Sequence, residues 1–270
     1  MPTPATDSAG HERWGVGDAY ERFMGRLSRP VAARFVAWLA VQDGARWLDV
    51  GCGTGALSET ILSLASPREV LGIDPSPGFV MHAERELASD RARFDVGDAQ
   101  SLAVPDGSFD AAVSGLVLNF VPKPERAVAE MARVTRPGGT VAFYVWDYAE
   151  GMQCLRVFWD AATSLDPGAL AVDEGRRFPI CRPESLARLA RGAGLADVTD
   201  LAIEVATRFA SFDDYWGPFL GAQGPAPGYV ASLDITRRDA LRDRIRERLP
   251  LAPDGSIALT ARAWAVKGTR

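Results

Sequence analysis

One short stretch constrains the fold of this chain more than any other: an apolar strand, three alternating glycines and the start of a helix. Residues 46–50 form an apolar run that fits a parallel strand covered on both faces. Gly51, Gly53 and Gly55 follow at every second position. Because glycine has no Cβ atom, such a loop turns tightly and lets a ligand lie against the backbone. The helix that follows offers unpaired N–H groups to a carboxylate or another anion, so the stretch predicts a site for a nucleotide-like ligand.

The glycine spacing fits two kinds of cofactor. Gly51, Gly53 and Ala56 satisfy the G-x-G-x-x-G/A pattern of dinucleotide binding, which is a weak signal by itself. The fuller pattern D-x-G-x-G-x-G, which begins at Asp49, resembles motif I of the class I S-adenosylmethionine-dependent methyltransferases. The resemblance implies that the loop, with Cys52 in it, packs against the methionine end of the cofactor. It also implies that Asp49 supports the loop and the surroundings of the amino group.

The bulk composition excludes several classes of protein. With 270 residues the chain is long enough for one large domain, or for one domain with a cap. Its formal charge of −5 argues against a nucleic-acid binder. The three cysteines lack C-x-x-C spacing, so we expect no metal site, no disulfide and a cytoplasmic location. The chain has no apolar run of roughly 18 residues and no secretion signal, so we expect no membrane partner.

An acidic residue ends the second predicted strand. This strand covers residues 69–73 and ends at Asp74. A carboxylate at this position can accept both hydrogen bonds of a ribose diol, in dinucleotide enzymes and methyltransferases alike. The tripeptide Asp74-Pro75-Ser76 resembles motif II of the methyltransferases, which implies that Asp74 and Pro75 contact the adenosine part of the cofactor.

The third predicted strand, residues 91–96, is followed by a second acid. By the same resemblance, Asp98 binds the adenine amino group and the backbone N–H of Ala99 reaches a ring nitrogen. A plain strand-end turn is the alternative for this aspartate. Residues 97–110 as a whole resemble the methyltransferase stretch from motif III into the fourth strand, and this run argues against a dehydrogenase.

The fourth predicted strand, residues 109–113, leads into a segment at the carboxyl edge of the sheet, where α/β proteins bind their ligands. The resemblance implies that backbone carbonyls from Ser114 to Leu116 receive the cofactor ammonium and that Asn119 faces the methyl-transfer region. Packing against the core is the alternative for most side chains of this segment.

The order of predicted elements indicates an α/β fold with a Rossmann-like, doubly wound sheet. We expect seven mostly parallel strands, with the last strand antiparallel, and a helical cap. The predicted units are a disordered tail (1–10), N-terminal helices and the cofactor-binding core (11–146), a cap insertion (147–182), a continuation of the core (183–209), a second cap or lid segment (210–255) and a final edge strand (256–270).

Within the family, the chain resembles the small-molecule methyltransferases of the quinone-biosynthesis type. The implied reaction moves the methyl group of S-adenosylmethionine to a small, apolar or aromatic molecule by in-line displacement. Two alternatives stay open. One is a protein that binds S-adenosylmethionine without catalysis, and the other is an NAD(P)-dependent oxidoreductase.

The sequence contains no recognisable catalytic constellation, so the catalytic residues are left unassigned. Asp147, Tyr148 and His82 are weak candidates for a base. Trp14 and Tyr20 precede the glycine loop and fit either a lid over the cofactor or packing on the sheet. Arg26 could pair with the cofactor carboxylate or with an acidic side chain at the surface, and we favour the surface acid. The oligomeric state is not predicted.

Overall fold

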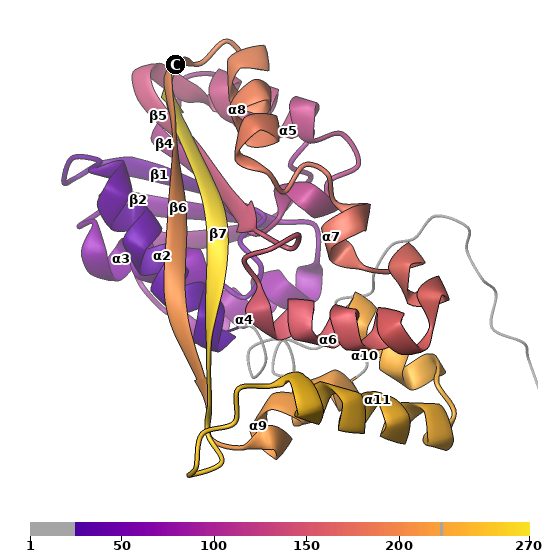
Figure 1. Ribbon diagram of the computed structural model, residues 1–270. Coiled ribbons are helices and arrows are strands. Elements are labelled where there is room, and N and C mark those ends of the chain that lie inside the picture. Colours follow the sequence, from indigo (N-terminus) through magenta and orange to yellow (C-terminus); the bar gives the residue numbers. More distant parts are fainter. Residues whose placement is uncertain (1–24, 222–223) are drawn as a thin grey trace, which may run out of the picture.

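The structure, a computed structural model, describes residues 25–221 and 224–270 (Figure 1). The predicted tail at 1–10 and the two aromatic residues Trp14 and Tyr20 lie outside the described residues. Within the described ranges, no helix combines the length and the apolar character that crossing a bilayer requires.

Seven strands of the described chain form one sheet, in the order β3-β2-β1-β4-β5-β7-β6. The strands are β1 (Arg46–Val50), β2 (Glu69–Asp74), β3 (Ala92–Val96), β4 (Phe109–Gly115), β5 (Thr135–Trp146), β6 (Ala196–Phe209) and β7 (Ile257–Thr269). The pairs among β1 to β5 are parallel, whereas β7 is antiparallel to both β5 and β6. The predicted fold class, a mostly parallel seven-stranded sheet with an antiparallel last strand, is confirmed.

The predicted position of the last strand is wrong. Residues 256–270 were expected at the sheet edge, but β7 lies between β5 and β6, and β6 is the edge strand. The two strands pair along most of their length, from Ala196 opposite Thr269 to Phe209 opposite Ile257. Because a hairpin pattern does not reveal which of its strands contacts the rest of the sheet, the sequence could not settle the order.

Helices cover both faces of the sheet, with α2 and α3 on one side and α5 and α8 on the other (Figure 1). The helical elements are α2 (Arg26–Leu39), α3 (Ala56–Leu64), α4 (Pro77–Glu86), η2 (Leu118–Phe120), α5 (Pro124–Val134), α6 (Gln153–Leu165), η3 (Pro167–Ala171), α7 (Glu174–Arg177), α8 (Pro183–Gly192), α9 (Phe212–Trp216), η4 (Gly217–Gly221), α10 (Pro225–Ser232) and α11 (Ile235–Arg248). The central strand β1 is fully buried from Trp47 to Val50, as a parallel strand covered on both faces should be.

The cap is built from two segments that are far apart in the sequence. Helix α6 follows β5, whereas α9, η4, α10 and α11 lie between β6 and β7. Helix α6 packs against α10 and α11 (Figure 1). Strands β5 and β6 run parallel to β1 and β4, so both cap segments start at the carboxyl edge of the sheet, where the glycine loop also lies.

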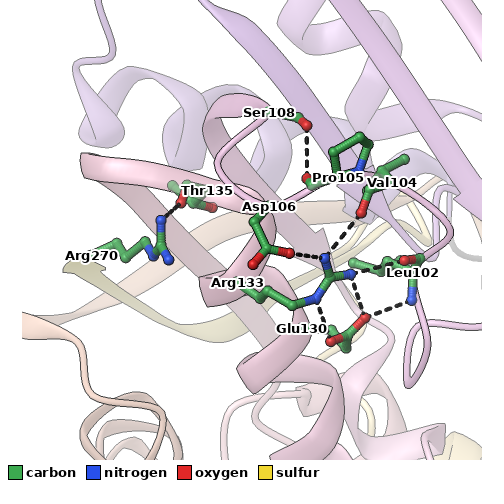
Figure 2. Close-up of polar contacts among 9 residues, drawn as sticks. All are labelled: Leu102, Val104, Pro105, Asp106, Ser108, Glu130, Arg133, Thr135 and Arg270. Atoms are coloured by element: carbon green, nitrogen blue, oxygen red, sulfur yellow. Dashed lines mark hydrogen bonds and ion pairs between the residues drawn. The ribbon is translucent and has the colours of Figure 1, made fainter.

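The loop between β3 and β4 is held by one arginine of α5 (Figure 2). Arg133 donates hydrogen bonds to the backbone oxygens of Leu102 (2.9 Å) and Val104 (3.0 Å) and to the carboxylate of Asp106 (2.5 Å). It also binds Glu130, whose Oε2 accepts the N–H of Leu102 at 2.8 Å. The hydrogen bond that Arg133 donates to the carboxylate of Glu130 lowers the pKa of Glu130. The loop that carries Asp98 is thus fastened to α5 at several points.

We predict that Arg133→Met lowers the free energy of unfolding by about 2–3 kcal/mol, because two loop carbonyls and a carboxylate lose a charged partner. Urea unfolding followed by tryptophan fluorescence measures this change. The matched control is Arg237→Met on α11, whose ion pair with Asp234 is exposed and should contribute less than about 1 kcal/mol. Equal losses for the two variants would contradict the role of Arg133.

Candidate functional site

The glycine loop joins β1 to α3 in a backbone conformation that only glycine adopts readily. Gly51, Gly53 and Gly55 have φ angles of +75°, +53° and +93°. A Cβ atom on Gly51 would lie 2.5 Å from Cγ1 of Val117, so this position also requires the missing side chain. A Cβ atom on Gly53 would meet no atom of the described residues within 4 Å, so these residues leave space beside the backbone there. The loop therefore presents bare backbone, as the sequence predicted.

Two N–H groups of the loop bind the adjacent strand. The backbone N–H groups of Gly51 and Cys52 donate to the carbonyl oxygen of Ile73 at 2.7 Å and 3.1 Å. The Cys52 side chain is buried, and burial raises the pKa of its thiol. We infer a packing role for this thiol, since a buried thiol with a raised pKa is a poor nucleophile.

Asp49 is a buried carboxylate with only one of its oxygens satisfied. Its Oδ2 accepts a hydrogen bond from Ser58 Oγ at 2.7 Å, and its buried Oδ1 has no hydrogen-bond partner within residues 25–221 and 224–270. Burial raises the pKa of Asp49 to about 7. The hydrogen bond from Ser58 lowers this pKa, and the negative charge of Asp74 raises it further. A buried carboxylate with a free oxygen suits a cationic ligand group. The sequence analysis missed Ser58, although a hydroxyl in the first turn of the helix after the glycine loop is the available signal.

Asp74 connects the glycine loop to the end of β2. Its Oδ2 accepts the N–H of Gly53 at 3.0 Å, and its Oδ1 accepts the N–H of Ser76 at 2.9 Å. The carboxylate is largely buried, and burial raises its pKa while these two hydrogen bonds lower it. Each oxygen keeps one further acceptor site, so the predicted contact with a ribose stays compatible with this geometry. Pro75 is exposed beside it.

Asp98 follows β3 and forms a tight turn. Its Oδ1 accepts the backbone N–H of Gln100 at 2.8 Å and the side-chain Nε2 of the same residue at 3.1 Å. Ala99 is partly buried against the core. The strand-end turn that the sequence left as an alternative is therefore present, and its second carboxylate oxygen keeps acceptor capacity for an adenine.

The end of β4 turns sharply toward the glycine loop. Ser114 is buried and donates from Oγ to the carbonyl oxygen of Val50 at 2.8 Å. Leu116 has a φ of +64°, and its N–H donates to the carbonyl oxygen of Tyr144 at 2.8 Å. A left-handed leucine persists only where its surroundings impose the conformation, and such residues are frequent at functional sites. Nothing in the sequence signals this conformation.

Asn119 lies in η2, directly after this turn. Both polar atoms of its side chain, Oδ1 and Nδ2, are buried and find no hydrogen-bond partner in the part of the chain that the structure describes. On either side of Asn119, Val117 packs against the glycine loop and the ring of Phe120 contacts that of Phe178 at 5.3 Å between centroids. The residue thus sits between the loop and the cap.

Two of the three weak candidates for a base are engaged elsewhere. The buried carboxylate of Asp147 binds Arg262 at 2.6 Å and 2.8 Å, which is a structural ion pair between β7 and the start of the cap. His82 lies on α4 beside Arg85. Tyr148 is buried, with its ring 5.7 Å from that of Phe178.

The basic residue at position 26 pairs with a surface acid, as expected. Arg26 binds Asp214 of α9 at 3.0 Å and 3.1 Å, and each side chain is about one-third exposed.

The predicted site residues meet at one edge of the sheet. The glycine loop and Asp74 are hydrogen-bonded to each other, and Gly51 lies against the turn that follows β4. Asp98 follows β3, the strand next to β2. The carboxyl ends of four adjacent parallel strands thus surround bare backbone and two buried carboxylates, the place where ligands bind in open α/β sheets.

A sequence-family model described as a methyltransferase domain matches residues 48–143. The chain is 33% identical over 188 residues to the demethylmenaquinone methyltransferase of Roseiflexus castenholzii, which covers 64% of this chain and 77% of that protein. It is 34% identical over 124 residues to the malonyl-[acyl-carrier protein] O-methyltransferase of Pectobacterium atrosepticum, covering 46% and 47% of the two chains. The chain spans 35–55% of the length of the first three curated relatives that it matches.

The fold agrees with these matches. The crystal structure of the YcgJ protein from Bacillus subtilis superposes with a TM-score of 0.58 at 18% identity, covering 89% of this chain and 97% of that one. The named relatives are methyltransferases, so the oxidoreductase alternative is wrong and the non-catalytic alternative gains no support. The glycine loop, the acids at the next two strand ends and the matched sequence together place this chain in the class I S-adenosylmethionine-dependent methyltransferase family.

Proposed function

We propose that this protein transfers the methyl group of S-adenosylmethionine to a small molecule. One observation carries the proposal: the glycine loop follows directly on Asp49, whose Oδ1 has no hydrogen-bond partner among the described residues, and is bound through the N–H of Gly53 by Asp74. A buried carboxylate oxygen and loop backbone without side chains therefore lie together at the edge of the sheet where the family binds its cofactor. Both features suit a ligand with an ammonium group at one end and a ribose diol beside it.

The residues present fit the cofactor. Asp49 Oδ1 offers a partner to the ammonium group, and the open space beside Gly53 admits the methionine chain. Asp74 retains acceptor sites for the ribose, and Asp98 with the N–H of Ala99 matches the donor and acceptor edge of adenine. Backbone carbonyls from Ser114 to Leu116 complete the ammonium site. When bound, the cofactor supplies an electrophilic methyl group on a sulfonium.

The chain's own contribution is alignment and exclusion of water, which are worth up to roughly 7–11 kcal/mol of the barrier. The turn after β4 contacts both the glycine loop through Val117 and the cap through Phe120. It can therefore set the spacing between the bound cofactor and a substrate under the cap. No base is assigned, because Asp147 is held by Arg262 and His82 by Arg85.

The residues between the turn and the cap favour an apolar or aromatic substrate. The rings of Phe120, Phe178 and Tyr148 form a contiguous aromatic cluster that joins η2 to the segment after α7; Tyr148 is buried in it and Phe120 is exposed. A planar ring binds an exposed aromatic side chain by offset or edge-to-face contacts. Of the substrates in the names of the two relatives, demethylmenaquinone is a closer chemical match to aromatic side chains than malonyl-[acyl-carrier protein].

The proposed function is tested by incubating the protein with S-adenosylmethionine and a panel of quinols, phenols and small fatty acids. Mass spectrometry then measures S-adenosylhomocysteine and methylated product. We expect product from aromatic members above a control without protein. Tight binding of the cofactor with no transfer to any panel member would favour binding without catalysis, and no binding of the cofactor would sink the proposal.

We predict that Asp74→Asn weakens S-adenosylhomocysteine binding by about 1.5–3 kcal/mol, the range for hydrogen bonds to a charged group. The amide has one acceptor oxygen, so it cannot hold the loop N–H groups and a ribose diol together. Isothermal titration calorimetry measures the change. Glu69→Gln at the opposite end of β2, where the side chain pairs with Arg46 at the surface, is the matched control. Unchanged affinity in Asp74→Asn would refute the ribose role.

We predict that S-adenosylhomocysteine binds more tightly as the pH rises from about 5 to about 7. In the free protein, burial raises the pKa of Asp49 to about 7. An ammonium partner favours the ionised carboxylate, so binding lowers this pKa and releases a proton. Affinity should therefore rise by up to about tenfold per pH unit below the free pKa and level off above it.

Asn at position 49 does not titrate, so Asp49→Asn should flatten this pH dependence. Calorimetry in buffers of different ionisation enthalpy counts the released protons directly. The same slope and the same proton count in Asp49→Asn would show that another group, such as the buried Glu174 of the cap, is responsible.

A further inference from the structure

Strand β6 ends the sheet and leaves one long backbone edge open (Figure 1). Among residues 25–221 and 224–270, no strand pairs with β6 on the side away from β7. Its pairing with β7 runs without a break from Thr199 to Phe209, so the open side is long as well. Such an edge presents a row of N–H and C=O groups, and another strand adds to it unless the edge is shortened, covered or charged.

The hydrogen bonds of two opposite residues show which backbone groups of β6 point outward. The carbonyl oxygen of Glu204 accepts a hydrogen bond from Nη1 of Arg34 on α2, so it points away from β7. Opposite Glu204, Arg262 of β7 donates its N–H to the carbonyl oxygen of Gly151 at 3.1 Å, away from β6. The two residues are thus a non-hydrogen-bonded pair. Because such pairs alternate in an antiparallel ladder, the even-numbered residues from 202 to 208 direct N–H and C=O outward.

The side chains along this edge are complementary to a second copy of themselves. Residues 204–208 read Glu-Val-Ala-Thr-Arg. The side chains of Glu204 and Arg208 are 61% and 70% exposed, and Ala206 between them is also exposed. When two copies of this strand lie antiparallel about Ala206, each Glu204 faces an Arg208, and the small alanine faces itself. Opposite charges that face each other across two strands stabilise their pairing.

We propose that two copies of this chain join their β6 edges in a symmetric dimer, with the twofold axis at Ala206. The central alanine pair and the two pairs of Glu204 with the partner subunit's Arg208 each exchange two backbone hydrogen bonds. The N–H of the partner subunit's Arg208 takes the acceptor position on the Glu204 carbonyl that Arg34 fills within one chain. The same patch serves both subunits, as a twofold interface requires.

Charge selects this register over the neighbouring one. An axis at Glu204 would bring Asp200 opposite Arg208, but it would also place the carboxylate of Glu204 against its own copy at the centre. The ion pairs within one chain do not prevent the dimer. Glu204 lies 3.5 Å from Arg262 and Arg208 lies 3.1 Å from Asp254, and ion pairs of such exposed side chains are weak.

Sedimentation velocity of the full chain across the micromolar range, at low salt, measures the dissociation constant of the dimer. We expect a monomer–dimer equilibrium for the wild type. Glu204→Arg should raise the dissociation constant about tenfold or more, because both cross-strand pairs change from attraction to repulsion. Combining it with Arg208→Glu restores both pairs and should recover the wild-type value within about threefold. Asp200→Arg, a charge reversal on the same strand outside the ladder, is the matched control and should have little effect.

A proline tests the backbone hydrogen bonds separately from the charges. The N–H of Ala206 points away from β7, so Ala206→Pro keeps the β6–β7 pairing and should leave the melting temperature nearly unchanged. It removes both central hydrogen bonds of the dimer and should raise the dissociation constant about tenfold. Ala202→Pro also removes an outward N–H, but one that lies beyond the three residue pairs, so this control should dimerise like the wild type.

Three results would overturn the proposal. A wild type that stays monomeric over the whole concentration range would show that the edge binds no second copy. A dimer that survives both Glu204→Arg and Ala206→Pro would use another surface. A dimer that Asp200→Arg weakens as much as Glu204→Arg does, or that the double variant does not recover, would refute the axis at Ala206. None of these outcomes bears on methyl transfer, since β5 and β7 separate β6 from the strands that carry the glycine loop and its neighbours.

Discussion

Hydrogen bonding to two buried carboxylates fixes the glycine loop and the start of the helix after it, on which the rest of the site depends. Asp74 accepts one N–H from the glycine loop and one from the loop after β2, and Asp49 accepts the hydroxyl of Ser58 on α3. Burial raises the pKa of both acids, so each carries a desolvation cost that a cationic or hydroxyl-bearing ligand relieves. Together with the backbone hydrogen bonds from Gly51 and Cys52 to the carbonyl oxygen of Ile73, these contacts hold the left-handed backbone of the loop in one shape. The burial of these two carboxylates lowers the stability of the fold at this edge, and the same carboxylates form the ligand-binding surface before any ligand is present.

The cap depends on the core through long-range contacts. Both cap segments leave the sheet at the carboxyl ends of parallel strands, one after β5 and one after β6. Arg262 of β7 binds Asp147 at the start of the first segment, and Tyr215 of the second donates its hydroxyl to the carbonyl oxygen of Cys154 on α6 at 2.6 Å. The contact between the rings of Phe120 and Phe178 is a further link between the core and the cap. Under the proposed function, this arrangement would let the cap determine the substrate while the loop binds the cofactor.

Local sequence signals were sufficient for the strands, the glycine loop and the acids at the strand ends, because apolar runs and glycine spacing act within a few residues. The order of β6 and β7, the pairing of Asp147 with Arg262 and the left-handed Leu116 were not predictable. Each depends on partners that are distant in the chain: 115 residues separate the members of that ion pair. The chain order placed Asn119 just after the fourth strand, as in the structure, whereas its role at the methyl-transfer region stays a prediction; its unsatisfied amide is visible only once the turn is folded.

The central claim is that the edge formed by the glycine loop, Asp74 and the turn after β4 binds an adenosyl sulfonium. A crystal structure of the protein grown with S-adenosylhomocysteine tests it most directly. The account predicts the amino group within hydrogen-bond distance of Asp49 or of the carbonyls from Ser114 to Leu116, and the ribose hydroxyls on Asp74. Density for the ligand in another part of the molecule, or none at millimolar ligand, would contradict the account.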